Sequence, residues 1–340
     1  MILLLALCAC SAPFADDTNT SADDSAAGDD SGETTDTEDT DTSDTSETGD
    51  TSETGETGEL PDTGPVVPAP CDTWAEPRDV GLLADDVYQE VSGVAPSVIN
   101  PGVLWILEDH GNDPAFYAID LTGSTLGTLA LEGAENEDWE AIALGPCPTG
   151  TCLWAADVGD NGLERTEVTL YRVPEPDVGW GGGLDESVVP ERFPLVYTDG
   201  PVNVEAFLVT PEGLPVLLSK RGDGLSEVYV VDTVVPELVV APRFIGTFQT
   251  RDAEAEAGGF VTSADLWPDG SRLLVRTYEA AWELDLGTGG IEGIAAAPRT
   301  MLPFSDERQV EAVAYDAVLG GYWQIPEGVG APLSFVACVD

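Results

Sequence analysis

The fold is decided by the stretch Asp138-Trp139-Glu140-Ala141-Ile142, because its pattern, polar-x-Glu-Ala-apolar, returns along the chain. Asn203-Val204-Glu205-Ala206-Phe207 begins 65 residues later, and Gln309-Val310-Glu311-Ala312-Val313 begins 106 residues after that. The second interval is about twice a unit of roughly 50 residues, and Phe260-Val261-Thr262-Ser263-Ala264-Asp265 lies midway, with another residue in place of Glu. A weaker copy, Val91-Ser92-Gly93-Val94, comes first. Self-similarity at a regular spacing indicates a repeat architecture.

Each copy is followed by similar strand-like pieces separated by Gly, Pro and Asp turns. A second apolar piece begins at Val103, Cys152, Pro215, Arg272 and Tyr322. A third piece often shows an aromatic-x-x-Asp pattern, as in Tyr117 to Asp120, Tyr229 to Asp232 and Trp282 to Asp285. A fourth, variable piece closes several units. Four antiparallel strands in a unit of about 50 residues are typical of a β-propeller blade.

Five units can be read, so the sequence predicts an all-β fold: a β-propeller of about five four-stranded blades over residues 71–340. A degenerate sixth blade in a long connection stays open. The last unit has only three strands, and we expect the segment Glu76–Leu83 to supply its outer strand and close the ring. The rival fold is a β-sandwich, but a sandwich gives no reason for a recurring Glu-Ala start.

The folded domain contains four cysteines, Cys71, Cys147, Cys152 and Cys338. Four cysteines in an exported chain suggest two disulfides, with three possible connectivities. The short spacing of Cys147 and Cys152 favours a disulfide between them that closes a short loop. Cys71 would then pair with Cys338 and join the two ends of the domain. A zinc site is disfavoured, because the spacing is wrong and the chain has a single His.

The N-terminus carries an apolar run over residues 1–9, MILLLALCA, that is too short for a membrane-spanning helix of about 20 apolar residues. It fits the apolar region of a signal peptide. Leu7-Cys8-Ala9-Cys10 resembles the lipobox of bacterial lipoproteins, which implies a lipid on Cys10. Ser11 follows that cysteine, and by analogy with such lipoproteins we expect an outer-membrane or cell-surface location. The alternative is an ordinary secretory signal cleaved near Ala12 or Ala15.

Residues 11–70 are predicted to form a disordered, acidic stalk rich in Thr, Asp and Glu. Residues 11–64 hold 18 acidic residues and no Lys or Arg, and large apolar residues are almost absent. Removing these from the chain's 64 acidic residues leaves 46 against 12 Lys and Arg, a net charge of −34 for the folded domain. Such a surface repels nucleic-acid phosphates and favours cationic partners or metal ions.

Several stretches together resemble an uncharacterised family of exported bacterial propeller proteins. They are DWEAIALGP from Asp138, LWAADVGDNGLERTEVTLYRVPEP from Leu153, YTDGPVNVEAFLV from Tyr197, VTSADLWPDGSRLLVRTY from Val261, and QVEAVAYD from Gln309. The likeness covers most of residues 90–330, and more loosely it extends to TolB-like and SMP30-like propellers. It implies fold and export but no established reaction. The chain departs from the family pattern at Glu108-Asp109-His110, which weakens any site role for Glu108.

The repeated polar positions should converge on one mouth of the propeller channel, because inner strands begin and second strands end at the same face. The candidates at this mouth are Asp109, Asp138, Glu140, Asp157, Glu205, Lys220, Arg276, Glu311 and Glu327. Several carboxylates with few cations repel one another unless they are protonated or bind metal. Calcium prefers such oxygen ligands. The candidate ligands are Glu140, Asp157, Asp160, Asn161, Glu205 and Glu311.

The alternative is structural: each Glu bonds backbone N–H groups of the next blade, and Lys220, Arg276 and Arg165 supply ion pairs. A lone His110 makes multi-His metal sites and Ser-His-Asp catalysis improbable. Phosphate-binding glycine motifs and basic patches are missing, so nucleic acid is excluded as a partner. Three functions remain: a lipid-anchored module binding a small molecule or protein, a calcium-dependent hydrolase of lactonase, phosphoesterase or phytase-like kind, or a structural envelope protein. The sequence does not decide whether the domain is an enzyme.

Overall fold

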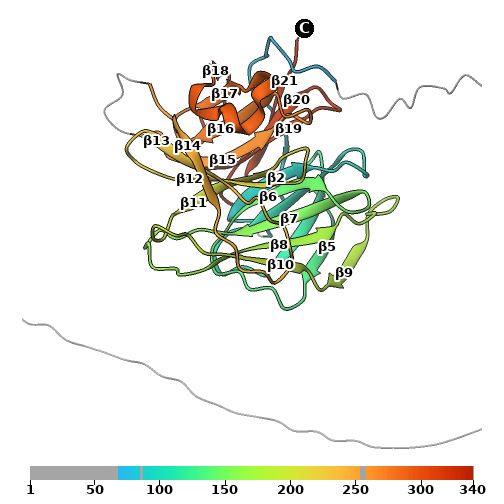
Figure 1. The fold of residues 1–340 in the computed structure, drawn as a ribbon. Helices are drawn as coiled ribbons and strands as arrows, with labels where there is room; N and C mark the ends of the chain where they lie inside the picture. The colour runs from blue at the N-terminus through green and yellow to red at the C-terminus, as the bar shows by residue number, and fades with distance from the viewer. Residues whose placement is uncertain (1–67, 85–86, 253–257, 340) are drawn as a thin grey trace, which may run out of the picture. The chain divides into compact units, whose positions relative to one another are not determined.

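The computed structural model describes residues 68–84, 87–252 and 258–339, and these form an all-β domain of five sheets arranged around a central axis (Figure 1). The signal peptide, the lipidated Cys10 and the stalk were predicted for residues that lie, except for 68–70, outside this range. Among the described residues, no helix is long and apolar enough to cross a membrane.

Each sheet is one blade, and its strands follow in order from the axis outward. Blade 1 contains β2 (Val91–Pro96), β3 (Val103–Glu108), β4 (Ala115–Asp120) and β5 (Thr125–Leu131); blade 2 contains β6 (Trp139–Pro146), β7 (Thr151–Asp157), β8 (Val168–Pro174) and β10 (Glu191–Leu195). Blade 3 contains β11 (Val204–Val209), β12 (Pro215–Ser219), β13 (Leu225–Val230) and β14 (Arg243–Gln249); blade 4 contains β15 (Val261–Leu266), β16 (Arg272–Thr277), β17 (Ala281–Asp285) and β18 (Arg299–Leu302). Blade 5 contains β19 (Val310–Asp316), β20 (Gly321–Pro326), β21 (Pro332–Ala337) and β1 (Arg78–Leu82).

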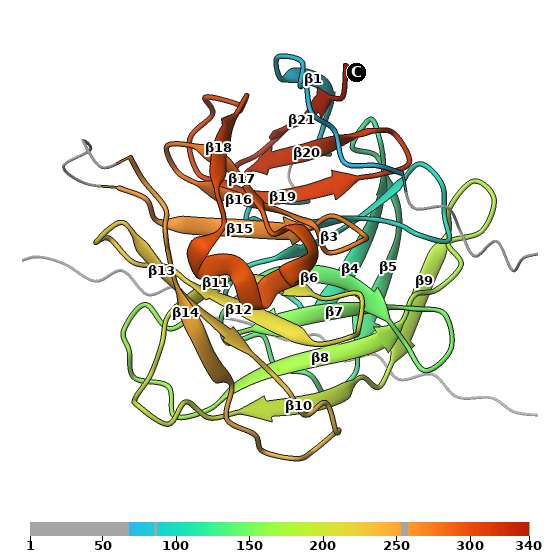
Figure 2. The ribbon, with the colours of Figure 1, turned by 45° about the horizontal axis from the view of Figure 1, so that its top comes forward.

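The five inner strands form a closed ring, in which β2, β6, β11, β15, β19 and again β2 are neighbours. Figure 2 shows β6, β11, β15 and β19 of this ring. The predicted five-bladed propeller is therefore confirmed, and no sixth blade is present in the described part of the chain. The inner copies of the repeat, including the one predicted at Val261, all begin inner strands.

The core lies between the blades rather than in one centre. Strands near the axis are buried along most of their length, and the VLWILE run of β3 is buried throughout. Strands further out alternate, as in the LSEVYV run of β13, where every second residue is buried. Five apolar clusters result, and each joins the facing sides of two adjacent blades. Every blade is thus held mainly by its two neighbours.

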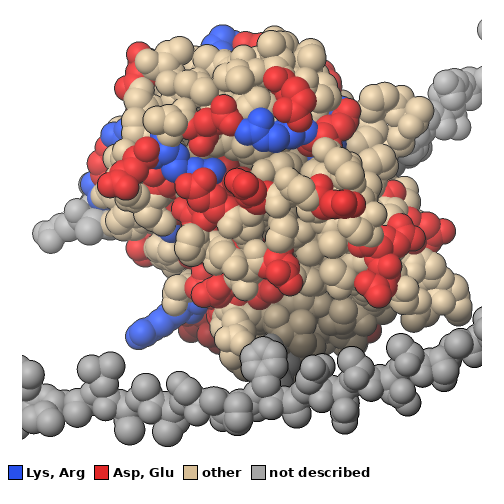
Figure 3. Space-filling view, turned by 90° about the horizontal axis from the view of Figure 1, so that it is seen from below, with Lys and Arg blue, Asp and Glu red and all other residues tan. Residues whose placement is uncertain are grey.

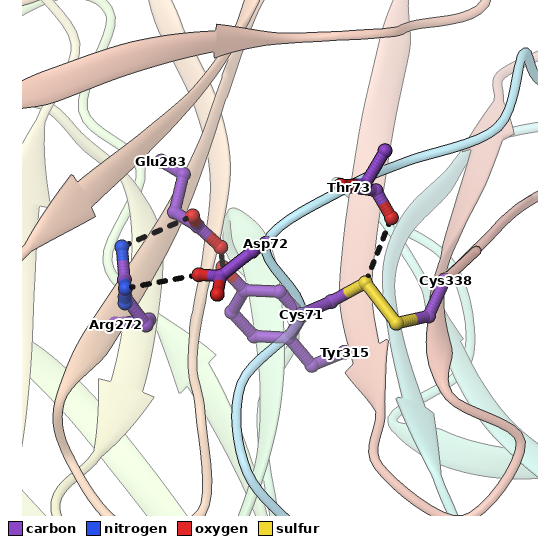
Figure 4. Close-up of a disulfide and its surroundings, with 7 residues drawn as sticks. All are labelled: Cys71, Asp72, Thr73, Arg272, Glu283, Tyr315 and Cys338. Atoms are coloured by element: carbon purple, nitrogen blue, oxygen red, sulfur yellow. Dashed lines mark hydrogen bonds and ion pairs between the residues drawn. A yellow bond between two sulfur atoms is a disulfide. The ribbon is translucent and has the colours of Figure 1, made fainter. Parts of the chain in front are cut away.

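The ring is closed by β1, which pairs with β21 as the outer strand of blade 5. Cys71 and Cys338 form the predicted disulfide beside this pairing, and Cys147 and Cys152 form the second one. Figure 4 shows Asp72 directed to Arg272, which also contacts Glu283. Since Cys71 and Cys338 are 267 residues apart, removal of this disulfide should cost about 2–5 kcal/mol.

Two elements were not predicted from the sequence. The long connection between β8 and β10 contains β9 (Leu184–Val188), which crosses to blade 1 and pairs in parallel with β5. This connection therefore supplies a fifth strand to an existing blade, not a sixth blade. A 3-10 helix, η1 (Gly287–Ala296), lies between β17 and β18 and buries Ile291 and Ile294.

Candidate functional site

Every inner strand begins with the same irregularity, a β-bulge at its second residue. The pairing of β2, β6, β11, β15 and β19 with their second strands skips one residue at this point. A bulge leaves that residue outside the ladder and redirects its side chain. The five skipped residues, all buried, are Ser92, Glu140, Glu205, Thr262 and Glu311. The Glu-Ala repeat of the sequence therefore marks the bulge that presents these side chains at one end of the channel, here called the mouth.

The two hydroxyl residues of this set join neighbouring blades. The Oγ of Ser92 donates a hydrogen bond to the main-chain oxygen of Glu140 at 2.9 Å, which links blade 1 to blade 2. Thr262 Oγ1 donates to the main-chain oxygen of Val310 at 2.7 Å, which links blade 4 to blade 5. At the bulged position, the hydroxyl groups therefore link neighbouring blades through main-chain atoms. The three Glu carboxylates at this position contact other side chains instead.

Glu205 and Glu311 are connected through a lysine and a tyrosine. Lys220, directly after β12, places Nζ 3.0 Å from Glu205 Oε2 and 5.1 Å from the ring centre of Tyr278. The hydroxyl of Tyr278 donates to Glu311 Oε1 at 2.7 Å. Burial lowers the pKa of Lys220, but Glu205 and Glu311 raise it more, so it ends above its ordinary value and the lysine is charged. Burial raises the pKa of Glu311 to about 7 against the opposing effect of Lys220.

A second group of carboxylates, here called the acidic trio, consists of Asp109, Asp138 and Glu140. Asp109 follows β3, Asp138 precedes β6, and Glu140 is the bulged residue of β6. One carboxylate oxygen from each residue lies within 4.8 Å of the others. Gly159 packs against this group, since a Cβ there would come within 2.3 Å of Glu140 Oε1 and 2.4 Å of Asp138 Oδ2.

The three carboxylates of the trio repel one another unless a proton or a cation offsets their charge. Burial, followed by neighbouring carboxylates, raises the pKa of Asp138 to about 6 and that of Glu140 well above its usual range. The pKa of Asp109 is also raised, mainly by burial. Glu205 is one of the carboxylates that raise the pKa of Glu140, because a nearby negative charge favours the protonated form. A bound proton or a metal cation would each relieve this repulsion.

His110 lies at the exposed rim of the trio. Its backbone N–H donates to Asp109 Oδ1 at 2.5 Å, and its ring Nδ1 contacts the main-chain oxygen of Glu137 and lies 3.8 Å from Asp138 Oδ1. The carbonyl of Glu137, despite a small opposing effect of burial, raises the pKa of His110, and the nearby Asp carboxylates add to this. His110 is thus a rim residue that orders the Asp109 loop.

The Asp157–Asn161 loop forms a separate network. Asp157 Oδ1 accepts from Arg165 Nη1 at 2.9 Å and from the backbone N–H of Asp138. Asp160 accepts from the backbone N–H groups of Glu164 and Arg165. Asn161 Oδ1 accepts from Asn203 Nδ2 at 3.1 Å. These three predicted metal ligands are therefore engaged by a cation, by backbone groups and by an amide.

Of the remaining predicted mouth residues, one lies at the mouth and one does not. Glu327 lies at the mouth, where its Oε2 accepts from Gln309 Nε2 at 2.8 Å and burial raises its pKa. Arg276 is fully buried and turned away, donating to the main-chain oxygens of Thr277 and Ser305 and stacking on Phe304 at 4.9 Å. The structure therefore brings Asp109, Asp138, Glu140, Glu205, Lys220, Glu311 and Glu327 to the mouth.

Two contributors were missed in the sequence. Tyr278 follows the end of a second strand, the same place that singled out Lys220, but it was read as part of an apolar piece. Asn203 precedes the repeated Glu, and its side chain contacts both Glu205 and Asn161. A hollow of about 490 Å³ opens beside this part of the mouth, and its lining includes Asn161, Asn203, Lys220, Arg221 and Phe260.

The similarity to known proteins is limited to the shape of the domain. No described protein family and no curated protein matches the sequence. Solved structures do match by shape, among them the PQQ-bound form of an aldose sugar dehydrogenase from Streptomyces coelicolor, at 12% identity and a TM-score of 0.44 over 79% of this chain and 99% of that one. The β-propeller domain of Cps50 (Swd1) from Myceliophteria thermophila matches at 12% identity and a TM-score of 0.41 over 78% of this chain and all of that one.

Proposed function

We propose that this chain is a propeller binding module whose channel mouth holds a divalent cation of the calcium class. The observation that carries the proposal is the acidic trio, in which Asp109, Asp138 and Glu140 each offer an oxygen within 4.8 Å of the others. Calcium–oxygen distances of about 2.3–2.6 Å allow ligands on opposite sides of one ion to be about 5 Å apart. Lys220 pairs with Glu205, and the cations that act on the trio, His110 and Arg165, lower the pKa of Asp138 less than burial and the neighbouring carboxylates raise it.

The bound cation would have two effects in this role. It would remove the repulsion that raises the pKa values of the trio, and so stabilise the domain by mass action. It would also leave coordination positions for a ligand that enters from solvent, since calcium takes six to eight oxygen ligands and the trio supplies fewer. The ligand class favoured by this chemistry is an oxygen-rich small molecule or a carboxylate on a protein.

We further propose that the domain is exported and anchored to the outer membrane or cell surface through Cys10, with residues 11–70 as its tether. The lipobox resemblance at Leu7–Cys10 and the two disulfides support this, because disulfides persist in oxidising compartments. Cys10→Ala should move the protein from the membrane fraction to the soluble exported fraction without changing the melting temperature of the domain. Retention of the variant in the membrane fraction would contradict the anchor.

A calcium-dependent hydrolase is the second candidate, and the hollow beside Lys220 favours it. The ammonium of Lys220, with Asn161 and Asn203, lies where an anion formed during ester cleavage could be stabilised. The cation would activate water at the trio. The ion pair with Glu205 weakens this candidate, because it already engages the lysine.

The decisive experiment is a calcium titration of the full chain followed by melting temperature. We expect wild type to melt several degrees higher in millimolar calcium than in chelator, because the ion binds only the folded state. Glu140→Gln should abolish this difference. Glu311→Gln is the matched control, since Glu311 is a bulged carboxylate satisfied by Tyr278 and should leave the calcium response intact.

Two outcomes would reject the cation site. Unchanged melting of wild type in calcium would do so, and so would an equal loss of response in both variants, which would indicate a general charge effect. Screening of wild type and Glu140→Gln against lactone and phosphoester substrates separates the binding module from the hydrolase.

A further inference from the structure

The end of the channel opposite the mouth is an apolar hollow of about 480 Å³. All five inner strands contribute to it, with residues from their C-terminal halves or from the turns that follow. The apolar part of its wall includes Val94, Ile142, Leu144, Val209, Leu266 and Trp267. The hollow is large enough for a small organic molecule, and such sites combine apolar walls with a few fixed polar groups.

Asp265 supplies the charge in this hollow. Among the residues of the described chain that line it, Asp265 is the only Asp, Glu, Lys, Arg or His. Its Oδ2 accepts a hydrogen bond from the backbone N–H of Tyr315 at 2.8 Å, which fixes the side chain against the neighbouring inner strand. The Tyr315 hydroxyl is engaged elsewhere, donating to Glu283 Oε1 at 2.7 Å.

Asp265 is both surrounded by protein and open to the hollow. The residue is partly exposed to water, whereas burial raises the pKa of its carboxyl to about 7. These two facts agree if the exposed part faces the hollow, since the hollow is the space that Asp265 lines. A carboxyl in such surroundings ionises more readily when a cation lies beside it.

We propose that the hollow binds a small organic amine, whose ammonium group pairs with Asp265 and whose apolar body packs against the aliphatic wall. Charge complementarity selects this class of ligand. An anion would face the carboxylate, and a sugar would find apolar groups over most of the wall. An ammonium–carboxylate hydrogen bond is strong in a site of low dielectric. This inference does not depend on the cation site at the mouth.

The test uses two probes of the same shape, phenethylamine and 2-phenylethanol, titrated calorimetrically into the full chain near pH 8. Wild type should bind the amine at least about tenfold more tightly than the alcohol, the usual advantage of a charged hydrogen bond over a neutral one. Asp265→Asn keeps an acceptor for the Tyr315 N–H but removes the charge, so it should bind both probes equally. Asp269→Asn is the matched control, because this exposed carboxylate does not line the hollow and should leave the preference unchanged.

A second variant tests the location. Leu144 is partly exposed and lines the hollow, so Leu144→Trp should fill it and prevent binding of both probes. Equal affinity of wild type for amine and alcohol, or an unchanged preference in Asp265→Asn, would overturn the proposal.

Discussion

The two ends of the propeller channel are built by the same five strands but have opposite chemistry. At the mouth, the bulges present three Glu side chains and two hydroxyls, and Asp109 and Asp138 add two more carboxylates. At the other end, the strands present Val, Ile and Leu side chains around a single carboxyl, that of Asp265. The blade repeat therefore fixes where side chains are placed, and the residue type at each place decides what that end can bind.

The two ends of the channel also differ in the groups that offset the negative charge of their carboxyls. Lys220 and Tyr278 engage Glu205 and Glu311, while the acidic trio is left in need of a cation. Asp265 is compensated by backbone N–H groups, among them that of Tyr315, and lies within an apolar wall. Acidic side chains also cover more of the face drawn in Figure 3 than basic ones do, in keeping with the chain's formal net charge of −52. Cations are therefore the expected ligands at both ends, but of different kinds.

Removal of the Cys71–Cys338 disulfide should have the largest effect on stability and should act far from the mouth. Replacement of both cysteines by Ser should lower the free energy of unfolding by about 2–5 kcal/mol. The calcium response at the mouth should persist at temperatures where the variant is folded. Urea unfolding monitored by tryptophan fluorescence measures the loss.

The second disulfide is the control for this prediction. Cys147 and Cys152 are five residues apart, against 267 for the other pair, and a disulfide that closes a shorter loop restricts the unfolded chain less. The double Ser variant of this pair should lose clearly less stability. Equal losses from the two pairs would argue against a special role for ring closure.

Gly159→Ala should damage the mouth and leave the opposite end intact. The added Cβ would overlap the carboxylates of Glu140 and Asp138, so the trio must move apart at a cost of about 1–3 kcal/mol. Calcium stabilisation should be lost, and phenethylamine binding should remain. Gly162→Ala is the control, since the nearest atom there is a side-chain carbon of Glu164 at 3.4 Å. A calcium response that survives in Gly159→Ala would show that the trio tolerates rearrangement.

The pH dependence of stability should contain a contribution from each end. Asp265 and Glu311 have pKa values near 7 in the fold, raised from 3.8 and 4.5 mainly by burial. A carboxyl that holds its proton better when folded contributes stability that is lost as the pH rises from its ordinary pKa to its folded pKa. Stability should therefore fall as the pH rises from about 4 to 7, and Asp265→Asn and Glu311→Gln should each flatten this fall. Urea unfolding at several pH values gives the slope, and an unchanged slope in both variants would contradict the assignment.

Thr262→Val should have the smallest effect. The substitution keeps the shape of the bulged residue and removes its hydrogen bond to the carbonyl of Val310, so about 0.5–1.5 kcal/mol of stability should be lost. Neither calcium nor amine binding should change. A loss of calcium response here would mean that the hydroxyls, and not only the carboxylates, take part in the mouth.

The fold could be predicted well because the copies of the repeat can be aligned with one another, and each copy then marks the same strand of its blade. The Glu-Ala start located β6, β11 and β19, and the degenerate copies of the repeat located β2 and β15. The three-stranded last unit correctly required an outer strand from Glu76–Leu83, seen as β1. The bulge itself could not be predicted, since it depends on pairing with the second strand. β9 was missed for a related reason, because its parallel partner β5 is far away in sequence and its own residues are mostly exposed and polar.

Residues of the mouth were predicted by position and not by contacts. Asp109, Asp138 and Glu140 were among the candidates, but nothing in the sequence distinguished them as the group that comes together. Arg276 occupies an equivalent position near the end of a second strand, yet its long side chain turns between blades toward Ser305. Strand position fixes where a Cβ lies, whereas a flexible arginine side chain can reach partners on either side.

The disulfide between Cys71 and Cys338 also has a mechanical consequence. Tension on the chain upstream of Cys71 reaches the disulfide before it reaches β1, which begins seven residues further along, at Arg78. The covalent bond passes this load to Cys338, directly after β21, and Asp72 holds the same region through Arg272 (Figure 4). Trp74 packs edge-on against Tyr322 nearby. Without this disulfide, the load would separate β1 from β21 one hydrogen bond at a time. With it, the outermost strand is shielded, so the proposed N-terminal tether would load the disulfide before the ring could open.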